Sequence, residues 1–170
     1  MKPRVKESLD EQRVWLAPSW NADRDVPVVS RSALQWQLSR LGNRIGVTFF
    51  VTFTREEDSG MNGAEVASEQ VEAYRYQRGF PTYTHAVLVV IRSKRPHPQT
   101  GRYTYSAGLR VGRSLRNAGF DDADQARVLR EASHWVMWDN PEPNPQAFAR
   151  EVADKIVGEL SFSFITRNRK

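Results

Sequence analysis

The segment Val47-Thr-Phe-Phe-Val-Thr-Phe-Thr54 decides the fold, together with a second run, His85-Ala-Val-Leu-Val-Val-Ile91. Both runs are rich in β-branched or aromatic residues, which is typical of β-strands. Apolar residues occur at both phases of each run, whereas a strand with one wet face alternates apolar and polar residues. We therefore expect two central strands that are covered on both faces.

The segment between these two runs predicts how the strands are connected. Residues 55–63 are polar and form a loop, and residues 64–78 carry apolar residues at spacings of four and three, which is typical of a helix. Gly79 and Pro81 end that helix. A strand, a helix and a second strand in one sheet predict parallel strands joined by a right-handed crossover.

The regions on either side of this unit add a helix and a hairpin. Before the first strand, residues 31–45 are predicted to be helical, because four apolar residues recur along one stripe. These residues are Leu34, Leu38, Leu41 and Ile45. After the second strand, the turn-rich loop 92–101 leads into an alternating run, 102–109, which predicts an antiparallel hairpin.

Two further helices are predicted in the C-terminal third. The first is capped by Asp121 or Asp122 and runs to about Met137, and its inward residues are expected to be Ala126, Leu129, Ala132 and Val136. The second begins with Asn144 as the N-cap and Pro145 at the first helical position. Its inward residues are expected to be Phe148, Val152, Ile156 and Leu160.

The order of these elements predicts an α/β fold. Its core is a mixed β-sheet, made of a βαβ crossover plus an antiparallel hairpin, with helices on both faces. A chain of 170 residues is long enough for one such domain. We expect a partly ordered lead-in at 1–27, the α/β domain at 28–161, and an apolar and then basic tail at 162–170.

Composition excludes several classes of site. The chain has no cysteine, so disulfides, thiolate nucleophiles and cysteine-ligated metal centres are excluded. A net charge of +5 permits attraction to an anionic partner. Because the basic residues are scattered among acidic ones, an ordinary solvated surface is favoured and a nucleic-acid partner is disfavoured.

Acidic residues form two groups that are candidates for a metal site. Three carboxylates follow the first central strand, and three open the helix near residue 121, where carboxylates also cap a helix and complement its dipole. Hard cations such as calcium take several oxygen ligands, so convergence of the two groups would create a site for calcium or another divalent cation. The loop carboxylates are Glu56, Glu57 and Asp58, and the helix-start carboxylates are Asp121, Asp122 and Asp124.

The other reactive side chains favour no particular chemistry. The three histidines, His85, His97 and His134, are not spaced as ligands on one helix face, so structural roles are favoured for them. The chain contains no nucleophile elbow and no phosphate-binding glycine loop. The sequence therefore identifies no catalytic residue.

Four segments between residues 28 and 160 follow one another in an order and spacing that match a known family. They are Leu38-Ser-Arg-Leu-Gly-Asn-Arg-Ile-Gly-Val47, Ala86-Val-Leu-Val-Val-Ile91, Tyr105-Ser-Ala-Gly-Leu-Arg-Val-Gly112 and Asp121-Asp-Ala-Asp-Gln-Ala-Arg-Val-Leu129. In this pattern the chain resembles the TPM domain, a family named after a thylakoid acid phosphatase, a photosystem II repair factor and a receptor accessory protein.

The resemblance implies an accessory or protein-interaction module that acts in a membrane or envelope context and binds a divalent cation. Its partner would be a protein, with a membrane-embedded protein among the candidates. The alternative is an acid phosphatase that depends on a divalent cation, and a nucleic-acid-binding protein is the third hypothesis. No apolar run reaches the roughly 18 residues of a membrane-spanning helix. We therefore expect either the excised soluble domain of an envelope or membrane protein or a soluble outlier, with the compartment left open.

Overall fold

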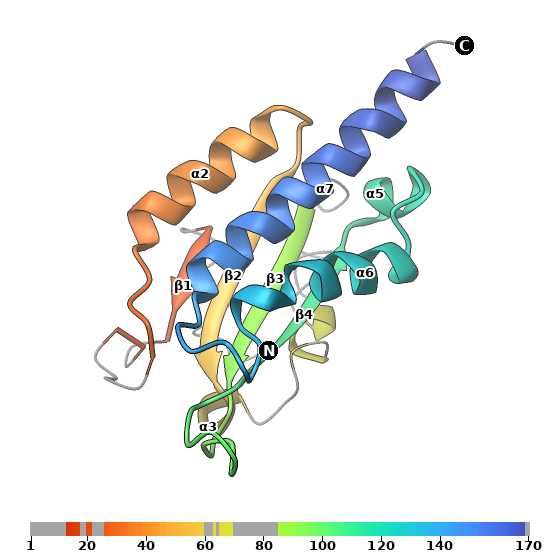
Figure 1. The fold of residues 1–170 in the computed structure, drawn as a ribbon. Helices are drawn as coiled ribbons and strands as arrows, with labels where there is room; N and C mark the ends of the chain where they lie inside the picture. Colours follow the sequence, from red (N-terminus) through yellow and green to blue (C-terminus); the bar gives the residue numbers. More distant parts are fainter. Residues whose placement is uncertain are drawn as a thin grey trace.

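A computed structural model describes residues 13–17, 20–21, 26–59, 63, 65–69 and 85–168. The strands are β1 (Val14–Leu16), β2 (Thr48–Arg55), β3 (His85–Arg92) and β4 (Tyr105–Val111). The helices are α2 (Arg31–Asn43), α3 (Glu56–Ser59), α5 (Arg113–Asn117), α6 (Asp122–Ala132), the 3-10 turn η1 (Ser133–Trp135) and α7 (Pro145–Asn168). Figure 1 shows α2, α6 and α7 together on one face of the sheet.

The sheet is mixed, as the sequence predicts, and its strand order is β1-β2-β3-β4. Strands β2 and β3 are parallel along their whole length, from the pair Thr48 and His85 to the pair Arg55 and Arg92. Strand β4 returns antiparallel to β3, and its first residue, Tyr105, lies opposite Arg92. The predicted α/β class, with its two parallel central strands and its hairpin, is confirmed.

Strand β1 is a strand that the sequence analysis does not predict. It pairs parallel to β2, with Val14 opposite Val51 and Leu16 opposite Phe53. Three residues are too few to show a period, so only their apolar character could have indicated the strand. Nearby Trp20 is fully buried, with its ring centroid 5.5 Å from that of Phe53.

The larger part of the core lies between the sheet and the helices α2, α6 and α7. The α7 start is as predicted, because the Asn144 side-chain oxygen accepts a hydrogen bond of 3.0 Å from the Ala147 backbone N–H. The predicted inward residues of α7 are all buried, namely Phe148, Val152, Ile156 and Leu160. The helical backbone of α7 continues to Asn168, into the segment predicted as a tail.

The opposite face of the sheet carries a smaller core, which joins Ala67 to four residues of the central strands. These four are Phe50, Val87, Val89 and Ile91. Residues 65–69 are helical, and the rest of the helix predicted at 64–78 lies outside the described residues. A side chain at Gly63 would place its Cβ 2.6 Å from the Gly108 backbone nitrogen, so the chain approaches β4 closely here.

The inward face of α6 agrees with the expected one in part. Of the predicted inward residues, Ala132 and Val136 are buried and Leu129 is partly buried, whereas Ala126 is exposed. The helix packs against β4 and α7, and its other buried positions are Gln125 and Val128. A polar residue, Gln125, therefore occupies a fully buried position.

Candidate functional site

The loop carboxylates lie in α3, at the carboxyl end of β2, where arginines hold two of them. Arg55 Nε lies 2.9 Å from Asp58 Oδ2 and 3.5 Å from Glu57 Oε1. Glu57 also forms an ion pair with Arg92, the residue opposite Arg55 in the neighbouring strand. These carboxylates therefore neutralise arginine side chains that lie next to each other at the carboxyl ends of β2 and β3.

Arg92 is buried although it is charged, and its surroundings account for its position. Its guanidinium carbon lies 4.2 Å from the centre of the Tyr103 ring, in a cation–π contact. A buried charge requires such partners, because removal from water is otherwise costly. The third loop carboxylate, Glu56, accepts a hydrogen bond of 3.1 Å from the Lys94 backbone N–H.

The helix-start carboxylates have local roles at the beginning of α6. Asp121 is the N-cap, and it forms a capping box in which the Asp121 and Asp124 side chains each accept a backbone N–H of the other residue. Asp122 lies 3.2 Å from Arg116. Asp124 also accepts a hydrogen bond of 2.8 Å from Arg127, which is the largest cause of a pKa below the usual value for its carboxyl.

The two acidic groups lie beyond opposite ends of the sheet's strands, so the expected convergence is wrong. The loop carboxylates follow the carboxyl end of β2, whereas α5 and α6 follow the end of β4 that pairs with Ala86, at the amino end of β3. Eight strand residues at about 3.3 Å each place these two ends about 26 Å apart along the strand. Figure 1 shows α3 at the opposite end of the sheet from α5. The described residues include no group of three His, Asp or Glu side chains placed to hold a metal ion.

The three histidines lie in three separate places. His85 is fully buried, and its ring meets Phe50 edge-on at 6.5 Å. His97 stacks on Trp138, with the ring centroids 5.2 Å apart. His134 lies 3.7 Å from Glu151. Packing and ion-pair contacts account for these positions, in agreement with the structural roles that the sequence favours.

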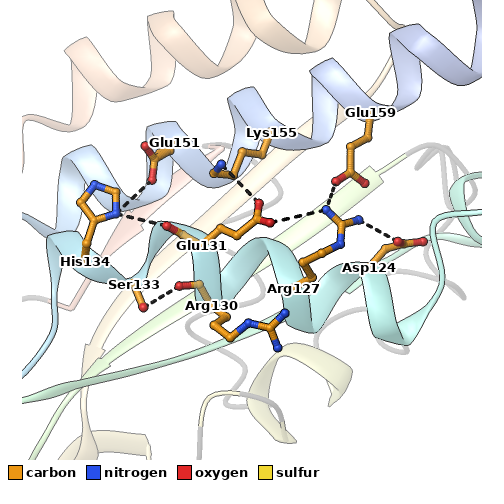
Figure 2. A network of polar contacts seen from close by, with 9 residues as sticks. All are labelled: Asp124, Arg127, Arg130, Glu131, Ser133, His134, Glu151, Lys155 and Glu159. Carbon is orange, nitrogen blue, oxygen red and sulfur yellow. Dashed lines mark hydrogen bonds and ion pairs between the residues drawn. The ribbon is translucent and has the colours of Figure 1, made fainter.

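A chain of charged side chains joins α6 to α7, and Figure 2 shows it across the helix pair. Arg127 lies at its centre and contacts Asp124 on its own helix and Glu159 on α7. These two carboxylates hold the pKa of Arg127 well above its usual value, with the Glu159 hydrogen bond as the largest cause. Glu131 extends the chain to Lys155 of α7, at 3.3 Å. The network adds polar contacts between α6 and α7 to the apolar packing of α7 on the sheet.

A groove of about 410 Å³ lies on the other side of α7, where this helix runs next to α2. The two helices begin close together, because the Ser30 backbone N–H donates a hydrogen bond of 2.8 Å to the Gln146 side chain. Figure 1 shows that they then cross the sheet in similar directions. The groove is lined by Trp36, Gln37, Arg40, Leu41, Arg44, Trp135, Arg150, Glu151 and Asp154.

Trp36 is the most unusual residue of this α2–α7 groove. It is 60% exposed, although the residues on either side along the helix stripe, Leu34 and Leu38, are fully buried. The Arg40 guanidinium lies 4.7 Å from the centre of the Trp36 ring and holds the ring in place on the helix surface. The sequence contained a signal for this residue, because an aromatic side chain out of phase with the apolar stripe must point outward.

The chemistry of the groove follows from its nine lining residues. None of them is Ser, Thr, Cys or His, and the acid–base groups that it contains are the carboxylates of Glu151 and Asp154. It offers two indole rings, one leucine side chain, one amide and five charged groups. Such side chains recognise a ligand by ring contacts, hydrogen bonds and ion pairs.

Within the described part of the chain, no helix combines the length and the apolar character needed to span a bilayer. The resemblance to the TPM domain stays a prediction. No protein-family model matches this chain, and no curated protein matches its sequence.

Proposed function

We propose that this protein is a non-catalytic accessory module that binds a protein partner through the α2–α7 groove. The observation that carries the proposal is the exposed Trp36 ring, which Arg40 orders at the edge of the groove. Tryptophan and arginine are the residue types that most often dominate binding energy at protein interfaces. The accessory role and the membrane or envelope context come from the resemblance to the TPM domain.

The exposed area of Trp36 is large enough to matter energetically. A tryptophan side chain offers up to about 250 Å² of surface, so an exposed share of 60% leaves about 150 Å² to cover. At about 25 cal/mol per Å², burying this area contributes up to about 4 kcal/mol to association. Ordering of the partner reduces that gain, but Arg40 already restrains the ring, so less is lost on the side of this protein.

The alternative function, a cation-dependent acid phosphatase, gains no support from the geometry. It needs carboxylates that share one cation, and the loop carboxylates and helix-start carboxylates are separated by the length of the sheet. Their side chains also have local partners, as described above. We therefore propose binding and not hydrolysis.

The proposal is tested by photo-crosslinking in the cells that produce the protein. A benzoylphenylalanine residue replaces Gln37, inside the groove, or Arg130, which is exposed on α6 outside the groove. We expect a discrete protein adduct from position 37 and none of the same mass from position 130. No adduct at position 37, or the same adduct at both positions, would overturn the proposal.

Two tryptophan variants make the test specific to the groove. Trp36→Ala is expected to abolish the adduct from position 37, whereas Trp138→Ala is expected to leave it intact. Trp138 is a matched control, because it is 47% exposed and stacks on His97, outside the groove lining. A phosphomonoesterase activity of the purified protein that requires a divalent cation would contradict the non-catalytic part of the proposal.

A further inference from the structure

The walls of the α2–α7 groove carry positive charges that no ion pair balances in the part of the chain that the structure describes. Helix α2 contains no acidic residue, and Arg40 and Arg44 line the groove at its end. Arg150 adds a third positive charge from α7. Among the described residues, the structure places no carboxylate within ion-pair distance of these three arginines.

The acidic residues of the groove do not offset this charge completely. The groove contains Glu151 and Asp154, both on α7. The Glu151 carboxylate lies 3.7 Å from His134, which Figure 2 shows on the side of the α6–α7 network. Three arginines thus face two carboxylates, and the charged residues of the α2 wall are all basic.

The length of the groove defines the size of a ligand. Trp36 lies in α2, and Arg44 lies eight positions later, at the C-cap of this helix. At 1.5 Å per residue, this separation corresponds to about 12 Å along the helix axis. An extended peptide covers this distance with about four residues, and a helical peptide covers it with about two turns. One large apolar side chain can rest on Trp36 and Leu41 while neighbouring carboxylates reach Arg44 and Arg150.

We infer that the partner enters the groove with an acidic peptide segment that carries a large apolar side chain, an inference that rests on the proposed function. The basic α2 wall binds the carboxylates of this segment, and Trp36 packs against its apolar side chain. A nucleic acid fits less well, because it carries a phosphate at every nucleotide and some of these would meet Asp154 and Glu151 on the α7 wall, whereas a peptide can alternate carboxylates with apolar side chains.

Synthetic peptides test the inference on the full chain. The probe is the acidic peptide acetyl-EDFEELDA-amide, and the comparisons are its basic counterpart acetyl-KKFKKLKA-amide and the apolar-depleted acetyl-EDSEESDA-amide. Binding is followed by the indole N–H signals of the five tryptophans in ¹H–¹⁵N spectra, with Trp36 assigned from the Trp36→Phe variant. We expect saturable shifts of the Trp36 signal with the acidic peptide, weaker binding of the serine version, and no binding of the basic version.

Charge reversal separates groove binding from general attraction. Arg44→Glu combined with Arg150→Glu is expected to weaken binding of the acidic peptide about tenfold, which is about 1.4 kcal/mol. The control, Arg95→Glu combined with Arg130→Glu, changes net charge equally at exposed positions outside the groove and is expected to leave the affinity within about twofold.

The outcomes distinguish this inference from the proposed function. If the acidic peptide does not bind at millimolar concentration, or if both double variants weaken it equally, the acidic-segment inference is overturned. Preferential binding of the basic peptide, or of an oligothymidylate, overturns it as well. In each of these cases the crosslinking result at position 37 still decides independently whether the groove is a protein-binding site.

Discussion

Replacement of Gln125 by methionine is expected to stabilise the protein. Gln125 lies on the buried stripe of α6 and is 1% exposed, and neither its amide oxygen nor its amide nitrogen meets a hydrogen-bond partner among the described residues. A buried polar group without a partner costs its desolvation energy and receives no hydrogen bond in return. The side chain therefore weakens the core that it occupies.

The size of the effect follows from the change in chemistry at constant shape. Protein mutational data assign about 1–3 kcal/mol to an unsatisfied buried amide. Methionine has a similar length and a similar helix propensity, so Gln125→Met changes packing and backbone preference little. We expect the free energy of unfolding to rise by about 1–3 kcal/mol. For a chain of this size, that corresponds to a Tm increase of about 2–4 °C per kcal/mol.

The assay is urea unfolding followed by far-ultraviolet circular dichroism, with thermal unfolding as a second readout. The m-value should stay constant, because the extent of the surface exposed on unfolding does not change. Gln35→Met on α2 is the matched control, since Gln35 is half-buried and its replacement is expected to change stability by less than about 0.5 kcal/mol. A Gln125→Met protein that is no more stable than the parent would refute the reasoning, because it would show that the amide is satisfied in solution.

Three further predictions concern the ends of elements and the acidic groups. Because the pKa of Asp124 is lowered in the folded state, its ionised form stabilises the protein above the ordinary carboxyl pKa of about 3.9, and this contribution disappears as pH falls through the lowered value. Asp124→Asn should therefore flatten the loss of stability on acidification, measured by urea unfolding from pH 5 downward. An unchanged slope would count against the role of Arg127. Gly42→Ala should lower the free energy of unfolding by about 1–3 kcal/mol, because the new Cβ would lie 2.1 Å from the Val47 carbonyl oxygen. Gly158→Ala should raise it by about 0.5–1 kcal/mol, because the new Cβ on α7 would meet open space. Equal effects of the two variants in thermal unfolding would contradict this difference in environment. Millimolar calcium should leave the Tm unchanged, because the loop carboxylates and the helix-start carboxylates do not meet, and a joint NMR response of both groups to the metal would disprove their separation.

Periodicity within a segment predicted the elements well wherever the segment was long. The two central strands and the hairpin appear within one to three residues of their expected ends. The last helix begins at Pro145 as expected but continues to Asn168, through most of the segment predicted as a tail. The three-residue strand β1 was not predicted, because a period needs more residues than it contains. The α6 face was predicted in part: Ala132 is buried as expected, whereas Ala126 is exposed and Gln125 is buried beside it, since alanines are tolerated on either side of a helix and carry little directional information.

The features of the candidate site were likewise predicted only in part from the sequence. The sequence located the six carboxylates at a strand end and at a helix start and identified Asp121 as a candidate N-cap, because these positions depend on neighbours along the chain. It did not predict the arginine partners of Glu57 and Asp58. The antiparallel hairpin that it predicted carries the chain back to the amino end of β3, so the helix-start carboxylates follow the opposite end of the strands from the loop carboxylates. The expected convergence ignored this consequence of the hairpin. The sequence also did not predict the α2–α7 groove, because a groove between two helices exists only once both have packed on the sheet.

Local patterns in the amino-acid sequence were enough to predict the mixed α/β class, because side-chain periods of two and 3.6 residues are local properties of the backbone. Which surfaces meet could be read only from the folded protein. The pairing of Arg92 with Glu57, the burial of Gln125 and the placing of three arginines around one groove all join residues that are distant in the chain or depend on how one helix is rotated against its neighbours. Such contacts are selected by the packing of the whole core, in which every helix must bury its apolar stripe at the same time.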